Sequence, residues 1–304
     1  MNDDHSAHPP TLGLLHLYSP HARLTAFESG DYESPHTIIF IGGLGDGLSA
    51  VPYLTPLSDA LQEIEWSVTQ VLLTSSYAGF GCTNIETDAR EIGELLTYLR
   101  KLGKTKFVLL GHSTGCQDIV KLVNDAKGAP GLLQGVVGTI LQAPVSDREY
   151  IVETLGQEAH QRSLTIASEL VSQGQPNHPI PSEFSEMFSG GRCSISASRW
   201  LSLASKLEDN PSGEDFFSSD LSVDQLKGHL RAFEKIPTMV LHGSRDESMP
   251  SGLDKQALLG RLTEGLGGAE AKEWSKVFEG AGHQAEEVID EICERIVNFI
   301  KAIF

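Results

Sequence analysis

The sequence predicts an α/β protein with a mostly parallel central sheet, helices on both faces and a helical lid insertion. Short apolar runs alternate with segments whose apolar residues recur at helical spacing, which is typical of parallel strands joined by helices. The run 38–41 is apolar throughout, as in a strand buried on both faces. About 90 residues separate two of the later predicted strands, whereas a helical crossover needs only about a dozen.

Length and composition are those of a globular protein, with 304 residues of which 40% are hydrophobic and 21% are charged. A single α/β domain can hold a chain of this length. The 41 acidic residues outnumber the 23 basic ones, and a formal net charge of −18 repels phosphate backbones. We therefore expect no nucleic-acid partner.

Membrane association and secretion are not expected either. No apolar run approaches the ~18 residues that span a bilayer, and the N-terminus has neither the basic start nor the apolar stretch of a secretion signal. The four cysteines are widely spaced and form no C-x-x-C pair, which argues against a disulfide framework or a zinc site. We expect a cytoplasmic protein that holds no cofactor or metal ion of its own.

The first elements are short. Residues 1–10 are polar with two prolines, and we expect a disordered tail there. Two short strands follow at residues 13–18 and 23–29, joined by a Ser-Pro turn. The next elements are a strand, a helix and a strand at residues 37–41, 51–64 and 66–73.

A long helix comes next. The segment from Thr83 to Glu86 resembles a capping box with Thr83 as N-cap, and it predicts a helix that runs to about residue 102 and stops at Gly103. Before the insertion we expect a strand, a helix and a strand at residues 106–110, 114–126 and 136–142. After the insertion we expect a strand, a helix, a strand and a closing helix at residues 238–242, 253–263, 274–278 and 286–303.

These elements divide the chain into a core and an insertion. We assign residues 11–147 and 237–304 to the core, and residues 148–236 to a separate lid. The lid would lie over the carboxyl ends of the strands, where open α/β sheets bind their ligands. A surface insertion without a role is the alternative.

The motif Gly111-His112-Ser113-Thr114-Gly115 carries the main functional signal. G-x-S-x-G alone is a weak motif, but here it directly follows a predicted strand and directly precedes a predicted helix. A serine on such a turn is held in a strained conformation that lifts its hydroxyl above the sheet, and the flanking glycines avoid a collision across the turn. We therefore predict Ser113 as a nucleophile, with a structural Gly/Ser turn as the alternative.

A serine hydroxyl needs a base within hydrogen-bond reach. In proteins that place a serine on such a turn, the acid and the histidine follow in that order, in loops after later strands. His283 lies between the last predicted strand and the last predicted helix, and of the 11 histidines it alone meets both conditions. We predict His283 as the general base.

Two acids fit the same order. Asp246 follows the second-to-last predicted strand, and Asp147 follows the strand before the insertion. We favour Asp246 because its loop begins with a glycine and closes with a proline, while the neighbouring Glu247 would demand a differently shaped loop. The acid would fix the histidine tautomer and stabilise the imidazolium.

Acyl transfer also needs two N–H donors for the oxyanion. We predict the backbone N–H groups of Thr114, directly after the serine, and of Leu44, in a loop with four glycines among residues 42–47. A phosphate-binding loop is the alternative for this segment, but it lacks the Lys-Ser/Thr ending of a P-loop and the G-x-G-x-x-G spacing.

The whole chain resembles an α/β-hydrolase with an insertion in the usual lid position. The strings GHSTGCQD at residues 111–118 and QAPVSDRE at residues 142–149 are narrower, and they resemble the fungal siderophore esterases that open the ester-linked ring of fusarinine C. The resemblance implies Ser113 as nucleophile, His283 as base and Asp246 as acid. It also implies an intracellular role, the release of iron from an imported ferric siderophore by cleavage of its ester bonds.

Ferric fusarinine C is expected to be cationic, because its hydroxamates neutralise Fe(III) while its amines are free. An acidic protein would attract such a substrate over a Debye length of ~8 Å. We thus expect a small-molecule partner, a cationic ferric siderophore, with iron only as part of the substrate. Two other functions stay open: a general carboxylesterase or thioesterase with the same residues, and a non-catalytic binding protein of this fold.

Overall fold

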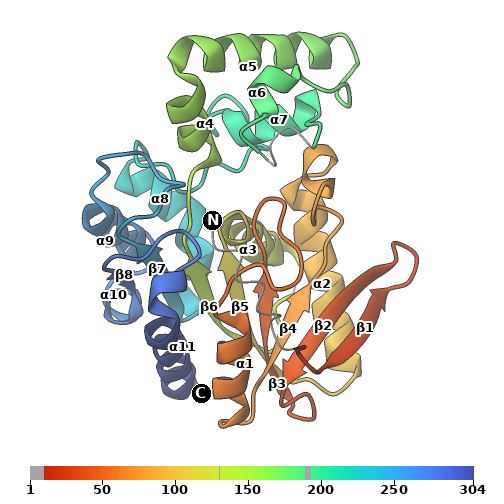
Figure 1. Cartoon of the computed structure of the whole chain (residues 1–304), viewed down its shortest axis with the longest axis vertical. Helices are drawn as coiled ribbons and strands as arrows, with labels where there is room; N and C mark the ends of the chain where they lie inside the picture. The colour runs from red at the N-terminus through yellow and green to blue at the C-terminus, as the bar shows by residue number, and fades with distance from the viewer. Residues whose placement is uncertain (1–9, 130, 189–192) are drawn as a thin grey trace, which may run out of the picture.

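The computed structural model describes residues 10–129, 131–188 and 193–304, and its centre is an eight-stranded sheet (Figure 1). The strand order is β1-β2-β4-β3-β5-β6-β7-β8, parallel from β4 to β8 with β1 and β2 antiparallel at one edge. The strands are β1 (Leu14–Ser19), β2 (Leu24–Gly30), β3 (His36–Ile41), β4 (Ser67–Val71), β5 (Lys106–His112), β6 (Val136–Gln142), β7 (Thr238–Gly243) and β8 (Lys276–Phe278). The predicted α/β class is confirmed, while residues 1–9 of the predicted tail lie outside the described residues.

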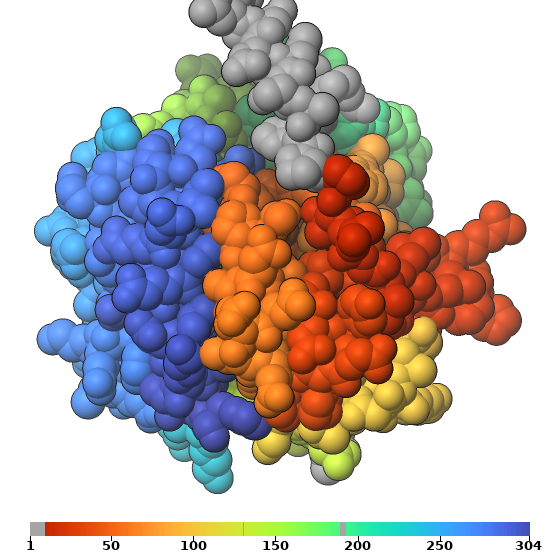
Figure 2. Space-filling model, turned by 60° about the horizontal axis from the view of Figure 1, so that its bottom comes forward, coloured from red at the N-terminus to blue at the C-terminus, as the bar shows by residue number. Residues whose placement is uncertain are grey.

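Helices cover both faces of the sheet, because successive residues of a buried strand point in opposite directions. Ile38 of β3 is buried in one apolar cluster with α1 (Leu54–Gln62) and α11 (Ile289–Ile303), which lie side by side (Figure 2). Its neighbour Ile39 is buried in a second cluster on the opposite face. That face is covered by α2 (Ile85–Lys101), α3 (Gly115–Asp125), α9 (Lys255–Gly265) and α10 (Ala269–Trp274). None of the helices in the described ranges is both long and apolar enough to cross a membrane.

The start of α2 differs from the prediction by one residue. The N-cap is Asn84, whose Oδ1 accepts a hydrogen bond from the Thr87 N–H at 2.9 Å. The assignment of Thr83 as N-cap is therefore wrong. Both residues have extended backbone and cap-forming side chains, so the residue types alone did not separate them.

The segment before the last strand also differs from the prediction. We expected a strand at residues 274–278, but β8 is shorter because Trp274 ends the unpredicted helix α10. Ser275 marks the boundary. Its hydroxyl donates to the Ala271 carbonyl at 2.6 Å and accepts from the Val240 N–H at 2.9 Å, so it both ends α10 and attaches it to β7.

The insertion between β6 and β7 is helical, and its first part lies beyond the carboxyl ends of the strands (Figure 1). The helices are α4 (Asp147–Leu155), α5 (Gln157–Ser172), α6 (Ser182–Ser185), α7 (Ala197–Ala204) and α8 (Val223–Leu230). The segment from α4 to α7, here called the cap, holds most of a third apolar cluster, which includes Trp200 and Phe184 and to which the body contributes Phe80. Trp200 Nε1 also donates to Ser163 Oγ at 2.9 Å, which joins α7 to α5.

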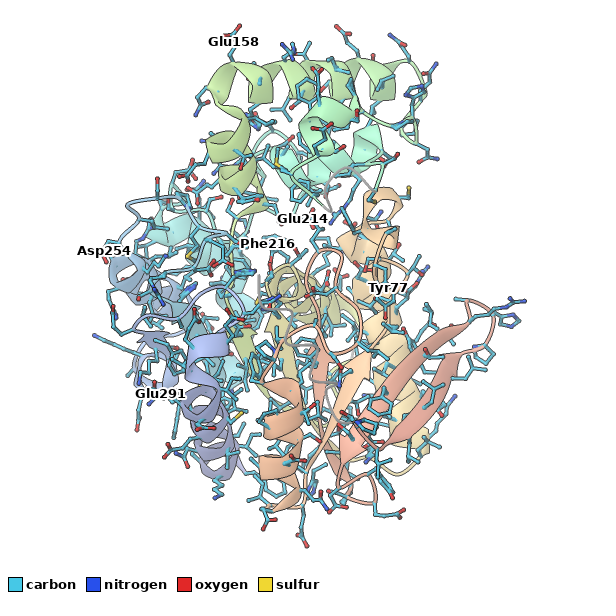
Figure 3. All side chains as sticks on the ribbon, viewed as in Figure 1. Tyr77, Glu158, Glu214, Phe216, Asp254 and Glu291 are labelled. Carbon is cyan, nitrogen blue, oxygen red and sulfur yellow. The ribbon has the colours of Figure 1, made fainter. Side chains whose placement is uncertain are left out.

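The second part of the insertion packs against the body of the protein. Phe216, Phe217, Leu226 and Phe233 are buried in the same apolar cluster as α2 and α3. Figure 3 places Phe216 beside the sheet and its helices, below the cap. The 90-residue segment that interrupts the predicted pattern therefore consists of a cap and of a second piece that completes the core.

A buried ion pair joins the cap to the body. Arg199 of α7 donates through Nη1 to Glu214 Oε1 at 2.5 Å and through Nε to the Phe80 carbonyl at 3.0 Å. The side chain of Arg199 is 3% exposed and that of Glu214 is 1% exposed. Removing one member of such a pair leaves an uncompensated buried charge, so Arg199 fixes the position of α7.

Candidate active site

Ser113 lies on the turn between β5 and α3, in the left-handed region of backbone conformation with φ +54°. This conformation is costly for a residue with a side chain and is held by the surrounding contacts. A Cβ on Gly115 would lie 2.3 Å from the Ile41 carbonyl oxygen, and one on Gly111 would lie 2.5 Å from the Gly115 oxygen. Both flanking glycines are therefore required by the close approach of backbone on this turn.

His283 and Asp246 form a hydrogen-bonded pair, although they follow different strands. Nδ1 of His283 lies 2.9 Å from Oδ1 and 3.0 Å from Oδ2 of Asp246. The side chain of Asp246 is 0% exposed, and its Oδ1 also accepts the Ser248 N–H at 2.9 Å. Of the two acids that fit the sequence order, Asp246 is thus the one that contacts the histidine.

The two groups shift each other's pKa in opposite directions. Burial would raise the pKa of the Asp246 carboxyl, but the hydrogen bond and charge of His283 hold it below its ordinary value. Burial would lower the pKa of His283, but the hydrogen bond and charge of Asp246 raise it above its ordinary value. An ionised carboxylate therefore faces an imidazole that gains a proton more readily than a free one.

Two further side chains fix the loop that carries His283. Glu247 Oε2 accepts the His283 backbone N–H at 3.0 Å, so this acid holds the main chain and not the ring. Gln142, at the end of β6, donates through Nε2 to the His283 carbonyl at 3.0 Å. Its Oε1 lies 2.5 Å from His112 Nδ1 and accepts the Tyr53 hydroxyl at 3.2 Å. Sequence reasoning missed Gln142, and the signal available was a polar residue that closes an otherwise apolar strand.

The predicted oxyanion donors lie next to the serine. Thr114 directly follows Ser113, and a Cβ on Gly43 would lie 2.7 Å from the Ser113 Cβ, so the loop that contains Leu44 runs against the turn. The Gly43 N–H is already used, because it donates to Asp46 Oδ2 at 2.7 Å. The N–H groups of Leu44 and Thr114 donate to no residue that the structure describes.

A cavity of about 400 Å³ brings these groups together. Ser113 and His283 both line it, as do Leu44 of the glycine-rich loop and Asp147 at the start of α4. The cap supplies apolar walls through Tyr150, Met187 and Phe188. The cavity therefore lies between the carboxyl ends of the strands and the cap.

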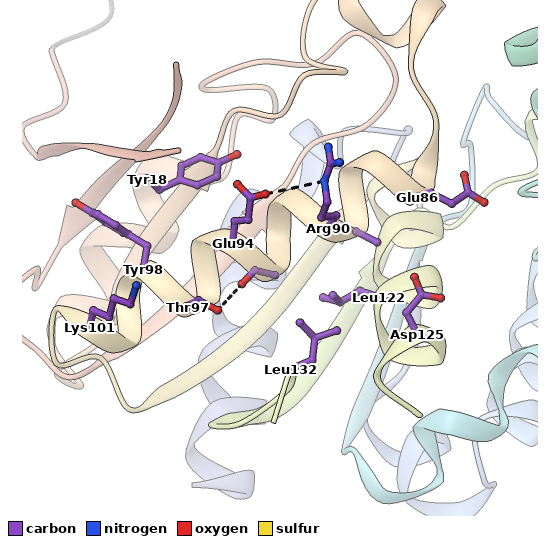
Figure 4. A pocket seen from close by; sticks show the side chains of 12 residues that line it. Tyr18, Glu86, Arg90, Glu94, Thr97, Tyr98, Lys101, Leu122, Asp125 and Leu132 are labelled. Carbon is purple, nitrogen blue, oxygen red and sulfur yellow. Dashed lines mark hydrogen bonds and ion pairs between the residues drawn. The ribbon is translucent and has the colours of Figure 1, made fainter. Parts of the chain in front are cut away.

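A second cavity, of about 580 Å³, lies on the outer side of α2 and α3 (Figure 4). Its lining includes Tyr18, Glu94 and Leu122 but none of the predicted site residues. Within residues 10–129, 131–188 and 193–304, no three His, Cys, Asp or Glu side chains are grouped to hold a metal ion. Of these two cavities, the one around Ser113 has the groups that acyl transfer needs.

The α/β-hydrolases share this arrangement: a serine on the turn after β5, and an acid and a histidine after the last two strands of the sheet. The chain is a carboxylic ester hydrolase of that fold. It belongs to the family described as a protein of unknown function (DUF1749), whose profile matches residues 1–301.

Curated and solved relatives agree with this assignment. The fusarinine C esterase sidJ of Aspergillus fumigatus is 33% identical over 82% of this chain and 81% of its own length. The esterase AN6793 of Emericella nidulans is 31% identical over 96% of this chain and 92% of its own length. The solved structure of the siderophore hydrolase EstB from Aspergillus fumigatus has a TM-score of 0.80 at 31% identity, covering 98% of this chain and 99% of that one. The resemblance to fungal siderophore esterases is confirmed.

Proposed function

We propose that this protein is a serine esterase that hydrolyses the ester bonds of a ferric hydroxamate siderophore of the fusarinine C type and so releases iron in the cytoplasm. The observation that carries the proposal is that His283, which is bonded to Asp246, lines one cavity with Ser113. The similarity to a fusarinine C esterase and to a siderophore hydrolase over most of their lengths supports the substrate class.

The positions of these groups support the following reaction. Nδ1 of His283 is bonded to Asp246, so Nε2 is the nitrogen left to take the proton from Ser113 Oγ. The oxygen then attacks the ester carbonyl, and the N–H groups of Leu44 and Thr114 stabilise the oxyanion. His283 returns the proton to the leaving alcohol, which leaves an acyl-enzyme on Ser113. Water activated by the same imidazole hydrolyses this intermediate.

The charge of the protein supports a cationic substrate. A formal net charge of −18 raises the local concentration of cations and speeds their encounter with the cavity. The cap supplies one wall of the cavity from helices that hold most of the third apolar cluster, and such a wall suits a substrate larger than a short acyl ester. Iron enters only as part of this substrate.

Product analysis tests the proposal directly. Purified protein is incubated with iron-loaded fusarinine C, with its N-acetylated relative and with a simple nitrophenyl ester, and the products are identified by mass spectrometry. We expect linear hydroxamate fragments from at least one siderophore, and none from Ser113→Ala. Cleavage of the nitrophenyl ester alone would instead define a general carboxylesterase.

A fluorophosphonate probe separates the enzyme from a binding protein of the same fold, because it labels only an activated serine. We expect labelling of the unaltered chain and none of Ser113→Ala. An unlabelled, folded chain would contradict the proposal.

A further inference from the structure

The cavity around Ser113 has an acidic lining. Asp46 and Asp147 both line it, and no lysine or arginine among the described residues does. The remaining basic side chains are His283 and His112, and burial lowers the pKa of His112 to about 3 with the charge of His283 adding to the effect. His112 is therefore neutral, and a positive group entering this cavity meets carboxylates.

The two carboxylates differ in what they already bind. Oδ2 of Asp46 accepts the Gly43 N–H at 2.7 Å, so this side chain supports the glycine-rich loop. Asp147 Oδ2 accepts from Gln117 Nε2 at 3.2 Å, and the same amide nitrogen donates to the Val145 carbonyl at 3.0 Å. Asp147 Oδ1 accepts no hydrogen bond from the described residues, and the residue lines the cavity while being only 7% exposed.

Gln117 also fixes Asp147 relative to the serine. It is the third residue of α3, the helix that begins two residues after Ser113. Asp147 is the first residue of α4. It follows the N-cap Ser146, whose hydroxyl accepts the Glu149 N–H at 3.2 Å. The carboxylate is thus held between the helix of the nucleophile and the first helix of the cap.

The charges of Arg199 and His283 act on Asp147, but Arg199 is bound to Glu214 and His283 to Asp246, and neither donates a hydrogen bond to Asp147. Its neighbour Arg148 is bound to Asp215 at 2.7 Å and to Asp220 at 2.6 Å, outside the cavity lining. Burial raises the pKa of Asp147 to about 7, with the charge of Glu214 adding to the effect and that of Arg199 opposing it, so the contact with a cation is best tested above this pH.

We propose that Asp147 is a specificity-determining residue that binds a cationic group on the acyl part of the ester, close to the carbonyl attacked by Ser113. The inference rests on the proposed esterase function and deepens it. The substrate class is an ester whose acyl chain carries an ammonium group, and a neutral or acylated nitrogen at that position would lose the charged contact. The acid that the sequence offered as an alternative to Asp246 thus acquires a separate role.

Two nitrophenyl esters of equal shape test the inference at pH 8. One has a 4-trimethylammoniobutanoyl group and the other a 5,5-dimethylhexanoyl group, so a quaternary nitrogen replaces a carbon and nothing titrates. The readout is the ratio of kcat/KM for the cationic ester to kcat/KM for the neutral one. Because both esters are measured on the same variant, a general loss of activity cancels in this ratio. In Asp147→Asn we expect this ratio to fall about tenfold or more, as for loss of a charged contact. In Asp147→Glu, which keeps the charge, we expect a substantially smaller fall.

A control removes the same charge elsewhere. Glu158 is exposed on α5, at the outer end of the cap (Figure 3), so Glu158→Gln should leave the ratio unchanged. A ratio in Asp147→Asn within about twofold of the unaltered protein would overturn the proposal. If neither ester is hydrolysed by the unaltered protein, the proposed function itself fails.

The unaltered protein gives an independent readout if Asp147→Asn does not fold. Choline and 3,3-dimethylbutan-1-ol have the same shape and differ in charge, and both can be tested as competitive inhibitors of nitrophenyl acetate hydrolysis. We expect choline to bind more tightly, and equal inhibition constants would overturn the inference.

Discussion

Replacement of Asp246 by asparagine tests the proposed acid–base pair most sharply. Oδ1 of Asp246 accepts the backbone N–H of Ser248 at 2.9 Å, and a backbone N–H can only donate. The asparagine oxygen must therefore take this position, and its NH₂ group then replaces Oδ2, which lies 3.0 Å from His283 Nδ1. An NH₂ donor at that place competes with the oxygen 2.9 Å from the same nitrogen and favours the tautomer with the ring proton on Nε2.

The wrong tautomer cannot take a proton from Ser113, so the loss falls on the chemical step. We expect kcat on a neutral nitrophenyl ester to fall by about 10³–10⁴-fold, which corresponds to about 4–5.5 kcal/mol of transition-state stabilisation. KM should change little, because Asp246 does not line the cavity around Ser113. Steady-state kinetics at pH 8 with a folded, circular-dichroism-matched variant give both constants.

Asp147→Asn is the matched comparison, since it removes the other acid that fits the sequence order. Its effect on the neutral ester should be at least about tenfold smaller than that of Asp246→Asn. The assignment is refuted if Asp147→Asn is the more damaging change, or if Asp246→Asn retains activity within tenfold of the unaltered protein.

Four further outcomes are expected. The base acts as neutral imidazole, and Asp246 raises the pKa of His283. We therefore expect kcat/KM to rise with pH through a midpoint above the ordinary histidine value of ~6.5. A flat profile from pH 5 to 8 would exclude His283 as the general base. Gly43→Ala places a Cβ 2.7 Å from the Ser113 Cβ and should lower kcat by roughly 10–10²-fold with the fold retained in circular dichroism. Arg199→Met leaves the buried Glu214 unpaired and should cost about 3–5 kcal/mol in urea unfolding, more than the exposed control Arg162→Met. Added salt should raise KM for a cationic siderophore with little change in kcat, and a salt-independent KM would remove the electrostatic argument.

The sheet could be predicted from the sequence because its central strands are buried on both faces. The continuous run at residues 38–41 and the glycine-flanked Ser113 each allow one local structure, and both are found where the pattern put them. The order of elements then placed Asp246 and His283 in neighbouring loops. Whether their side chains touch depends on loop conformation, which no periodicity encodes.

The features that were missed depend on contacts between distant segments. Gln142 is one polar residue at the end of a strand, and its importance comes from Tyr53, His112 and His283, which converge on it from three other parts of the chain. The helix α10 was not predicted, and the strand after it was predicted to begin at Trp274, because this residue type suits both structures. The division of the insertion follows from which cluster its apolar residues join, and this is a tertiary property.

The two walls of the cavity come from different parts of the chain. The loops of Asp246 and His283 are bonded to each other and to Gln142, whereas the facing wall belongs to helices whose apolar cluster also includes Phe80 and contacts Leu44 of the body. A chimera that exchanges residues 147–204 between relatives would therefore need to carry Glu214 and Asp215 with it, because they pair with Arg199 and Arg148 of the exchanged segment. Substrate preference within such a family can change through substitutions in the cap wall of the cavity while Ser113, His283 and Asp246 stay the same.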